Sequence, residues 1–168
     1  SSDIAIFKVD TSSSLVNLTG HGGSGLMGSE STVLFDTAVI ADSDVVTSLG
    51  SGTFGLGAAG SYLITVNILG TTSGGDGSAE GEYEMKLRTS NDRFSSNNVE
   101  VAALSPVRLG QGKSSLFTFS SIYLTTSGAG ESIKVTMNRV GNSGGVNDQQ
   151  VLNVNQNDSA IIQITKIA

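Results

Sequence analysis

The clearest hydrophobic pattern in the chain runs from residue 60 to residue 70, where side chains alternate with the period of two that a pleated β-strand requires. One face of this strand carries Tyr62, Ile64, Val66 and Ile68, and the other carries Leu63, Thr65, Asn67 and Leu69. A strand with one face in a core and one in water has a polar outer face, so the two leucines predict that the second face is covered as well. We therefore expect this central strand to contact a partner.

Similar alternation predicts the other strands. The cleanest amphipathic strand is 80–89, in which Tyr83, Met85 and Leu87 face inward while charged residues face water. We expect the remaining strands at 3–9, 32–40, 45–49, 99–104, 113–126, 133–137, 151–154 and 159–167.

Turn formers separate these strands. Residues 127–130 are expected to join the strands 113–126 and 133–137 into a hairpin. Residues 51–59 are expected to form a flexible turn before the central strand. Apart from one short strand, the segment around the only proline, Pro106, is expected to be a loop.

The composition fits many short strands joined by tight turns, because the 168 residues include 22 glycines, one proline and no cysteine. A domain of this length buries roughly 70% of the surface of its unfolded chain, so it can fold without disulfides. Apolar residues make up 38% of the chain and alternate steadily, which argues against a disordered linker. The net charge of -6 repels phosphate backbones and anionic lipids, so we expect no nucleic-acid and no membrane partner.

Three strings resemble catalytic or phosphate-binding motifs, but each lacks the required structural context. Gly55–Gly60 matches the dinucleotide pattern, yet a strand follows it instead of a helix. Gly112–Ser114 resembles the end of a phosphate loop but has Val107 where the first glycine belongs, and Gly141–Gly145 fits the nucleophile-elbow string without its flanking strand and helix. The only histidine is His21, in a glycine-rich loop. We expect no enzyme activity, no catalytic residue and no cofactor, with a carboxylate pair assembled by folding left open.

Oxygen ligands for calcium could come from two groups of carboxylates in or beside loops: Asp42 with Asp44, and Asp76 with Glu80 and Glu82. Neither group has the spacing of a known calcium loop. Surface carboxylates also keep an acidic protein soluble and discourage pairing of strand edges. We favour this solubilising role and leave a metal site open.

Three blocks have the order and spacing of a known family signature: Phe35-Asp36, Ser51-Gly52-Thr53-Phe54 and Gly60-Ser61-Tyr62-Leu63-Ile64. Gly60 follows Phe54 by six positions and Tyr62 follows it by eight, as in that family. These blocks, with the segments 130–135 and 158–167, resemble the tumour necrosis factor and complement globular-head superfamily. The strongest likeness is to its bacterial spore-surface and bacteriophage members. The chain departs from the family pattern at three positions, namely Ser51 for threonine, Gly57 for proline and Glu131 for aspartate.

The resemblance implies an all-β fold, an antiparallel β-sandwich of about ten strands with the jelly-roll topology of tumour necrosis factor. Within one domain overall, residues 1–31 are expected to form an N-terminal strand and glycine-rich arm, and residues 32–168 the jelly roll. The expected core contains Tyr62, Ile64, Val66, Tyr83, Met85, Leu87, Ile162 and Ile164.

The resemblance also implies a homotrimer, formed through the sheet that contains the first, central and last strands. The candidate interface residues are Leu63, Leu69, Ile161 and Ile167, which lie on the faces that are not needed for the core. Leaving such side chains exposed would forgo roughly 1.5 to 3 kcal/mol each and would invite aggregation.

The sequence contains no collagen-like repeat, coiled-coil heptads or membrane span to serve as a stalk, which favours a compact trimer on a symmetric surface. We favour a non-enzymatic virion protein that binds the major capsid protein and decorates and stabilises a phage head. In that interpretation Ile4, Ile6, Phe7 and His21 belong to a docking arm that orders on binding.

The alternative is a receptor- or carbohydrate-binding head of a phage fibre or bacterial surface protein, extracellular or at the cell surface. It would bind its ligand through the loops at 71–79 and 141–148.

Overall fold

Every regular element that the structure describes is a β-strand, and all strand pairs are antiparallel, which confirms the predicted all-β class. The structure is a computed structural model. It describes residues 3–8, 17–18, 31–35, 37–50, 52–71, 80–90, 99–110, 113–125, 131–143, 149–150 and 160–168.

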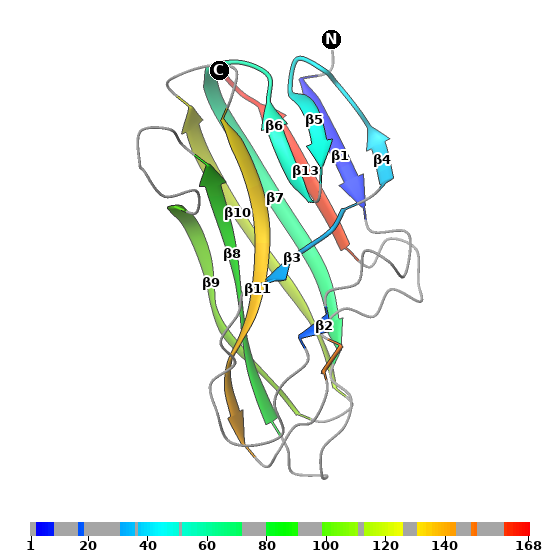
Figure 1. Cartoon of the computed structure of the whole chain (residues 1–168), viewed down its shortest axis with the longest axis vertical. Coiled ribbons are helices and arrows are strands. Elements are labelled where there is room, and N and C mark those ends of the chain that lie inside the picture. The colour runs from blue at the N-terminus through cyan, green and yellow to red at the C-terminus, as the bar shows by residue number, and fades with distance from the viewer. Residues whose placement is uncertain are drawn as a thin grey trace.

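Two sheets pack face to face to form the sandwich (Figure 1). The five-stranded sheet has the order β10 (Ser114–Thr125), β7 (Gly60–Thr71), β13 (Ala160–Lys166), β1 (Ile4–Lys8) and β4 (Thr37–Ile40). The six-stranded sheet has the order β5 (Val46–Gly50), β6 (Thr53–Leu56), β11 (Ser132–Ser143), β8 (Glu80–Ser90) and β9 (Val99–Gly110), with β3 (Ser31–Thr32) also paired to β11. Separately, β2 (Asn17–Leu18) pairs with β12 (Gln149–Gln150). Both ends of the chain lie at the same end of the sandwich (Figure 1).

The chain changes sheets at most of its connections, as a jelly roll requires. It pairs consecutive strands only at β5–β6 and β8–β9, among the described elements, and passes from one sheet to the other from β6 to β7, from β7 to β8 and from β9 to β10. The predicted hairpin of residues 113–126 and 133–137 is wrong, because β10 and β11 belong to opposite sheets. β10 and β11 each turn one side toward the core. Their side chains therefore alternate in the same way whether the two strands pair in one sheet or lie in opposite sheets.

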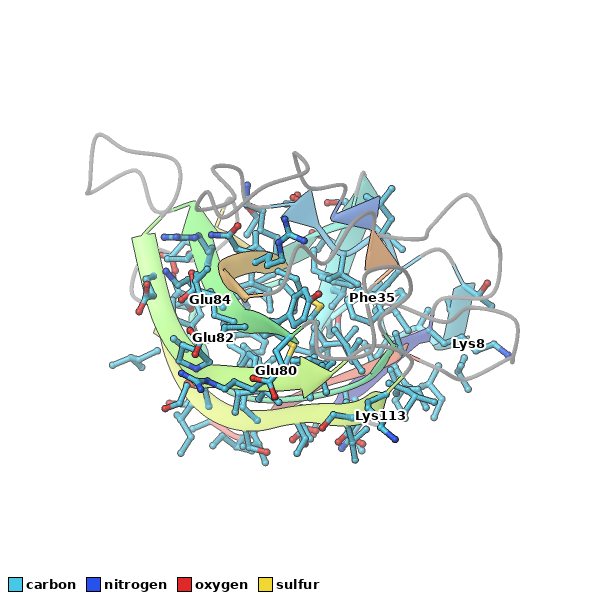
Figure 2. The ribbon with its side chains drawn as sticks, turned by 90° about the horizontal axis from the view of Figure 1, so that it is seen from below. Lys8, Phe35, Glu80, Glu82, Glu84 and Lys113 are labelled. Atoms are coloured by element: carbon cyan, nitrogen blue, oxygen red, sulfur yellow. The ribbon has the colours of Figure 1, made fainter. Side chains whose placement is uncertain are left out.

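The core lies between the two sheets and contains all eight predicted residues, each with no exposed surface. Three phenylalanines extend it. The ring of Phe54 lies 4.9 Å from that of Phe7 and 5.8 Å from that of Phe35. Viewed from the end opposite the chain termini, Phe35 lies between the two layers (Figure 2).

Residues 32–40 were expected to form one strand, but this segment crosses between the sheets. Ser31 and Thr32 pair with β11, and the Val33 amide donates a 2.9 Å hydrogen bond to the Val135 carbonyl. From Thr37 onward the chain pairs with β1 in the other sheet. Val33 and Phe35 are buried at the crossing, so their apolar character reflects the core between the sheets and not a continuous strand.

Two segments expected to be irregular are strands. Residues 53–56 form β6, which pairs with both β5 and β11, and Gly52 before it adopts the positive φ of a turn. Strand β9 continues through Pro106 to Gly110. Its register against β8 shifts between the pairs Tyr83–Val107 and Met85–Leu104, so the proline lies at a bulge in an edge strand, where the missing backbone N–H of proline is tolerated. The expected strand at 151–154 lies outside the described residues.

Candidate interaction surface

The outer face of the five-stranded sheet carries large apolar side chains where a solvated sheet would be polar. We call this surface the outer face, meaning the outward side chains of β10, β7, β13, β1 and β4. One row across it consists of Ile4, Thr165, Leu63 and Ile122, which are register partners on four neighbouring strands. Further along the same strands, Leu69 lies opposite Leu116. Aliphatic side chains therefore stand in two separate rows of the face.

Strand β10 presents the most exposed part of this face. Leu116, Ile122 and Leu124 are 56%, 64% and 59% exposed, although β10 is the edge strand of its sheet. Edge strands of monomeric proteins usually carry charged residues or are covered, because a free apolar edge promotes association. This stripe is therefore suited to contact with another chain.

The opposite outer surface, on the six-stranded sheet, is charged. Glu80, Glu82 and Glu84 follow one another along β8, well away from Lys8 (Figure 2). Glu82 pairs with Arg108, and Lys86 lies 3.1 Å from Glu84 and 3.3 Å from Glu100. The hydrogen bond that Lys86 donates to the Glu84 carboxylate is the main cause that raises the pKa of Lys86.

The two surfaces therefore differ sharply in charge. Among the described strand residues that point outward from the five-stranded sheet, Lys8 is the charged one. Ion pairs at a surface keep it hydrated, so the outer surface of the six-stranded sheet is suited to contact with water.

The structure places three of the four predicted interface residues on the outer face and the fourth, Ile167, just beyond it. Leu63, Leu69 and Ile161 are half-buried within it. Ile167 follows directly after β13, is 52% exposed, and donates a 2.8 Å backbone hydrogen bond to the Ser61 carbonyl of β7. These residues are spread along the face and do not form a single cluster.

The residues assigned to a docking arm divide between three places. Ile4 and Ile6 lie on the outer face, in register with Thr165 and Gln163 of β13, so they join the surface predicted for the trimer. Phe7 packs in the core and is not available for docking. His21 lies outside the described residues. Strand β1 is thus an inner strand of the sheet, between β13 and β4.

Sequence reasoning did not include the β10 stripe in the interface. The signal was present, because residues 114–125 have apolar residues on both sides of the strand, as the central strand does. Phe117 and Tyr123 take the core side, which leaves Ile122 and Leu124 outside.

Three hydrogen-bonded pairs of polar side chains lie on the outer face, two between β7 and β10 and one along β13. The hydroxyls of Thr65 and Ser120 are 3.1 Å apart, and the Thr118 hydroxyl donates a 2.7 Å bond to Asn67 Oδ1. On β13, Gln163 Nε2 donates a 3.2 Å bond to the Thr165 hydroxyl. Polar groups that already bond to each other cost less to bury than isolated ones.

A buried polar cluster joins the two sheets near one end of the sandwich. The Tyr123 hydroxyl donates a 2.8 Å hydrogen bond to Glu131 Oε2, and Thr89 Oγ1 lies 2.8 Å from the same hydroxyl and 3.0 Å from the Ser132 carbonyl oxygen. Glu131 is only 2% exposed. A carboxylate so enclosed is suited to holding the sheets together and poorly placed to meet a substrate.

The predicted calcium ligands are partly described. Asp42 Oδ1 accepts a 2.9 Å hydrogen bond from the Asp44 amide, so this carboxylate closes its own turn. Glu82 pairs with Arg108, and Asp76 lies outside the described residues. In the described part of the chain, no three or more aspartate, glutamate, histidine or cysteine side chains are grouped to hold a metal ion. The same residues contain no helix with the length and apolar character to cross a membrane.

Comparison with known proteins shows the fold. No family model and no curated protein matches the sequence. Among solved structures, Eiger TNF from S. frugiperda is similar, with a TM-score of 0.58 and 17% sequence identity, over 98% of this chain and 92% of that chain. The chain therefore has the TNF-like jelly-roll fold that its signature blocks predict.

Proposed function

We propose that the chain is a non-enzymatic assembly protein that forms a homotrimer through the outer face of its five-stranded sheet. The observation that supports this most directly is the contrast between the two sheets: one carries ion pairs, and the other carries aliphatic and uncharged polar side chains with a single lysine among its described outward strand residues. Exposed aliphatic side chains gathered on one face, with polar residues beside them, are typical of a protein–protein interface.

A closed ring can be built from the two different edges of this surface. The protruding stripe of β10 lies at one edge of the sheet, while Ile4, Ile6 and Ile40 lie on β1 and β4 at the other edge. One edge of a copy can therefore cover the opposite edge of the next copy. Such a head-to-tail contact closes into a ring when the rotation permits.

The trimer is tested with charge substitutions at Leu63 and Ile161, which lie on two different strands of the face. Leu63→Asp and Ile161→Asp together should give monomers or insoluble protein, because six carboxylates would be buried in a trimer. The matched control is Thr53→Asp, which adds a carboxylate to the outer surface of the six-stranded sheet and should leave the mass unchanged. A wild-type monomer, or a double variant of unchanged mass in light scattering, would count against the proposal.

We further propose that the trimer is a virion protein that decorates a phage capsid at its threefold positions. The support is the likeness of the sequence to phage and spore-surface members of the superfamily, together with the symmetry of a trimer. A protein that binds only the assembled shell stabilises it by mass action. Mixing purified trimer with undecorated capsids should raise the melting temperature of the capsids and fill the threefold positions in electron microscopy.

A receptor- or glycan-binding head is the second candidate, and the likeness to a TNF structure favours it. In that case the trimer would bind cell-surface glycans or a receptor and would have no affinity for capsids. Both assays use the same purified protein, so they distinguish the two roles directly. The non-enzymatic part of the proposal is checked with a panel of glycosides, where turnover that a single Asp or Glu substitution abolishes would contradict it.

A further inference from the structure

Hydrogen-bonded polar side chains lie together on β10, β7 and β13, in the middle of the outer face. We call this group the polar belt, and it consists of Thr65, Ser120, Asn67, Thr118, Gln163 and Thr165. Gln163, Thr65 and Ser120 are register partners on β13, β7 and β10, and Asn67 is the partner of Thr118 one row further along. On β7 and β10, Leu63 with Ile122 flanks the belt on one side and Leu69 with Leu116 flanks it on the other, while Thr165 on β13 stands in the row of Leu63.

The bonds within the belt use only part of its hydrogen-bonding capacity. Asn67 Oδ1 accepts from Thr118, which leaves the two protons of the Asn67 amide group to donate elsewhere. Thr65 and Ser120 share one hydrogen bond but carry two hydroxyl protons, so one proton remains. Gln163 gives one amide proton to Thr165 and keeps a second proton and its carbonyl oxygen. Water can serve these groups in a single copy, but a covered face must supply partners.

We propose that the polar belt fixes the register and the threefold stoichiometry of the assembly, while the apolar rows supply its affinity. This inference rests on the proposed homotrimer. Apolar contacts are not directional, so the rows of Leu63 and Leu69 could each meet a neighbouring copy in more than one alignment. A slide of two residues along β7, about 7 Å, would place the belt of one copy against an aliphatic row of the next.

Such a slide leaves amide and hydroxyl protons buried without acceptors, and the cost is repeated in every subunit. In the correct register the belts of the copies meet one another or share bridging waters. Hydroxyl and amide groups both donate and accept hydrogen bonds. The belt of one copy can therefore bond to the identical belt of another copy without charged groups. One buried polar position that sets the oligomeric state of an apolar interface is well attested in coiled coils, at a cost in stability.

The test replaces belt residues with apolar residues of similar size and measures the distribution of masses. Ser120→Ala with Thr65→Val removes one pair, and Thr118→Val with Asn67→Leu removes the other. Both variants should still associate, with a melting temperature no lower than that of the wild type. Native mass spectrometry should show the single trimer replaced by a spread of dimers and larger species. Thr118→Ser keeps the hydroxyl and should keep the single trimer.

Ser120→Ala alone serves as a second variant, because Ser120 is exposed on the edge strand and the fold should tolerate the change. Circular dichroism confirms folding in each case. A belt variant that stays a uniform trimer would overturn this inference alone, and a folded variant that falls to monomer would show that the belt supplies affinity instead of register. A wild-type monomer would overturn the proposed trimer and this inference with it.

Discussion

The Tyr123 hydroxyl of β10 donates a 2.8 Å hydrogen bond to the Glu131 carboxylate, next to the first residue of β11, and so connects the two sheets of the sandwich. Tyr123→Phe keeps the ring in the core but removes this donor from a buried carboxylate. We expect a loss of about 1–3 kcal/mol in the free energy of unfolding, the typical cost of removing one partner of a buried polar group.

Urea denaturation followed by circular dichroism measures this loss. Tyr62→Phe is a matched comparison, because the Tyr62 hydroxyl serves a partly buried loop, donating a 2.7 Å bond to the Ala58 carbonyl. We expect that variant to lose less stability than Tyr123→Phe, since water can reach its partner. Equal losses of unfolding free energy in the two variants would contradict the prediction that the bond to Glu131 contributes more stability.

The second prediction concerns Gly52, in the turn between β5 and β6. Its φ of +74° lies in the left-handed region, and a Cβ there would collide with the Val33 carbonyl oxygen. Gly52→Ala should therefore lower the free energy of unfolding by more than about 1 kcal/mol. Gly50→Ala is the control, because a Cβ at Gly50 would meet no atom within 4 Å. A Gly52→Ala variant as stable as Gly50→Ala would contradict the prediction.

These two sites show what the sequence could reveal. The glycine and tyrosine signature blocks, together with alternation, predict the fold and the core, because a core position repeats every second residue in a strand. Alternation cannot say which sheet a strand joins, so β10 and β11 were predicted to pair. It also gives no sign that Arg139 and Glu131 are buried, because a charged residue in a strand is expected to face water.

The candidate surface was predictable in part for the same reason. Leu63 and Leu69 stand on the side of β7 away from an obvious core face, so their place on the outer surface could be inferred. Ile122 lies in a strand where either side could have been the core side, and only the packing of Phe117 settles the choice. That Ile4 and Ile6 share this face depends on the pairing of β1 with β13, which is a contact between the two ends of the chain.

The third prediction tests the exposed stripe of β10. Replacing Ile122 and Leu124 with serine should change the free energy of unfolding by less than about 1 kcal/mol, because these side chains are more than half exposed in the single chain. Association should nevertheless weaken strongly, since the stripe would be buried in the proposed trimer. Sedimentation equilibrium over a range of concentrations measures the change. Unaltered association with a weakened fold would mean that the stripe serves the subunit and not the assembly.

The last prediction concerns pH. Burial raises the pKa of Tyr83 above its ordinary value of 10.0, and the nearby positive charge of Arg139 opposes the rise only in part. Arg139 is the register partner of Tyr83 on β11 and is itself fully buried. Above pH 10 the unfolded chain releases the Tyr83 proton while the folded chain still holds it, so the folded state binds more protons.

Stability from Tyr83 is therefore fully present below pH 10 and is lost as the pH rises toward the raised pKa of the folded state. The slope is at most about 1.4 kcal/mol per pH unit for one group. Tyr83→Phe removes the hydroxyl that ionises. From pH 8 to pH 11 the unfolding free energy of the wild type should therefore fall relative to that of the variant. Lysines and the other tyrosines titrate in both proteins and cancel in the comparison. A difference that stays constant over this range would mean that Tyr83 ionises equally in the folded and unfolded chains, which its enclosure beside Met85 and Arg139 argues against.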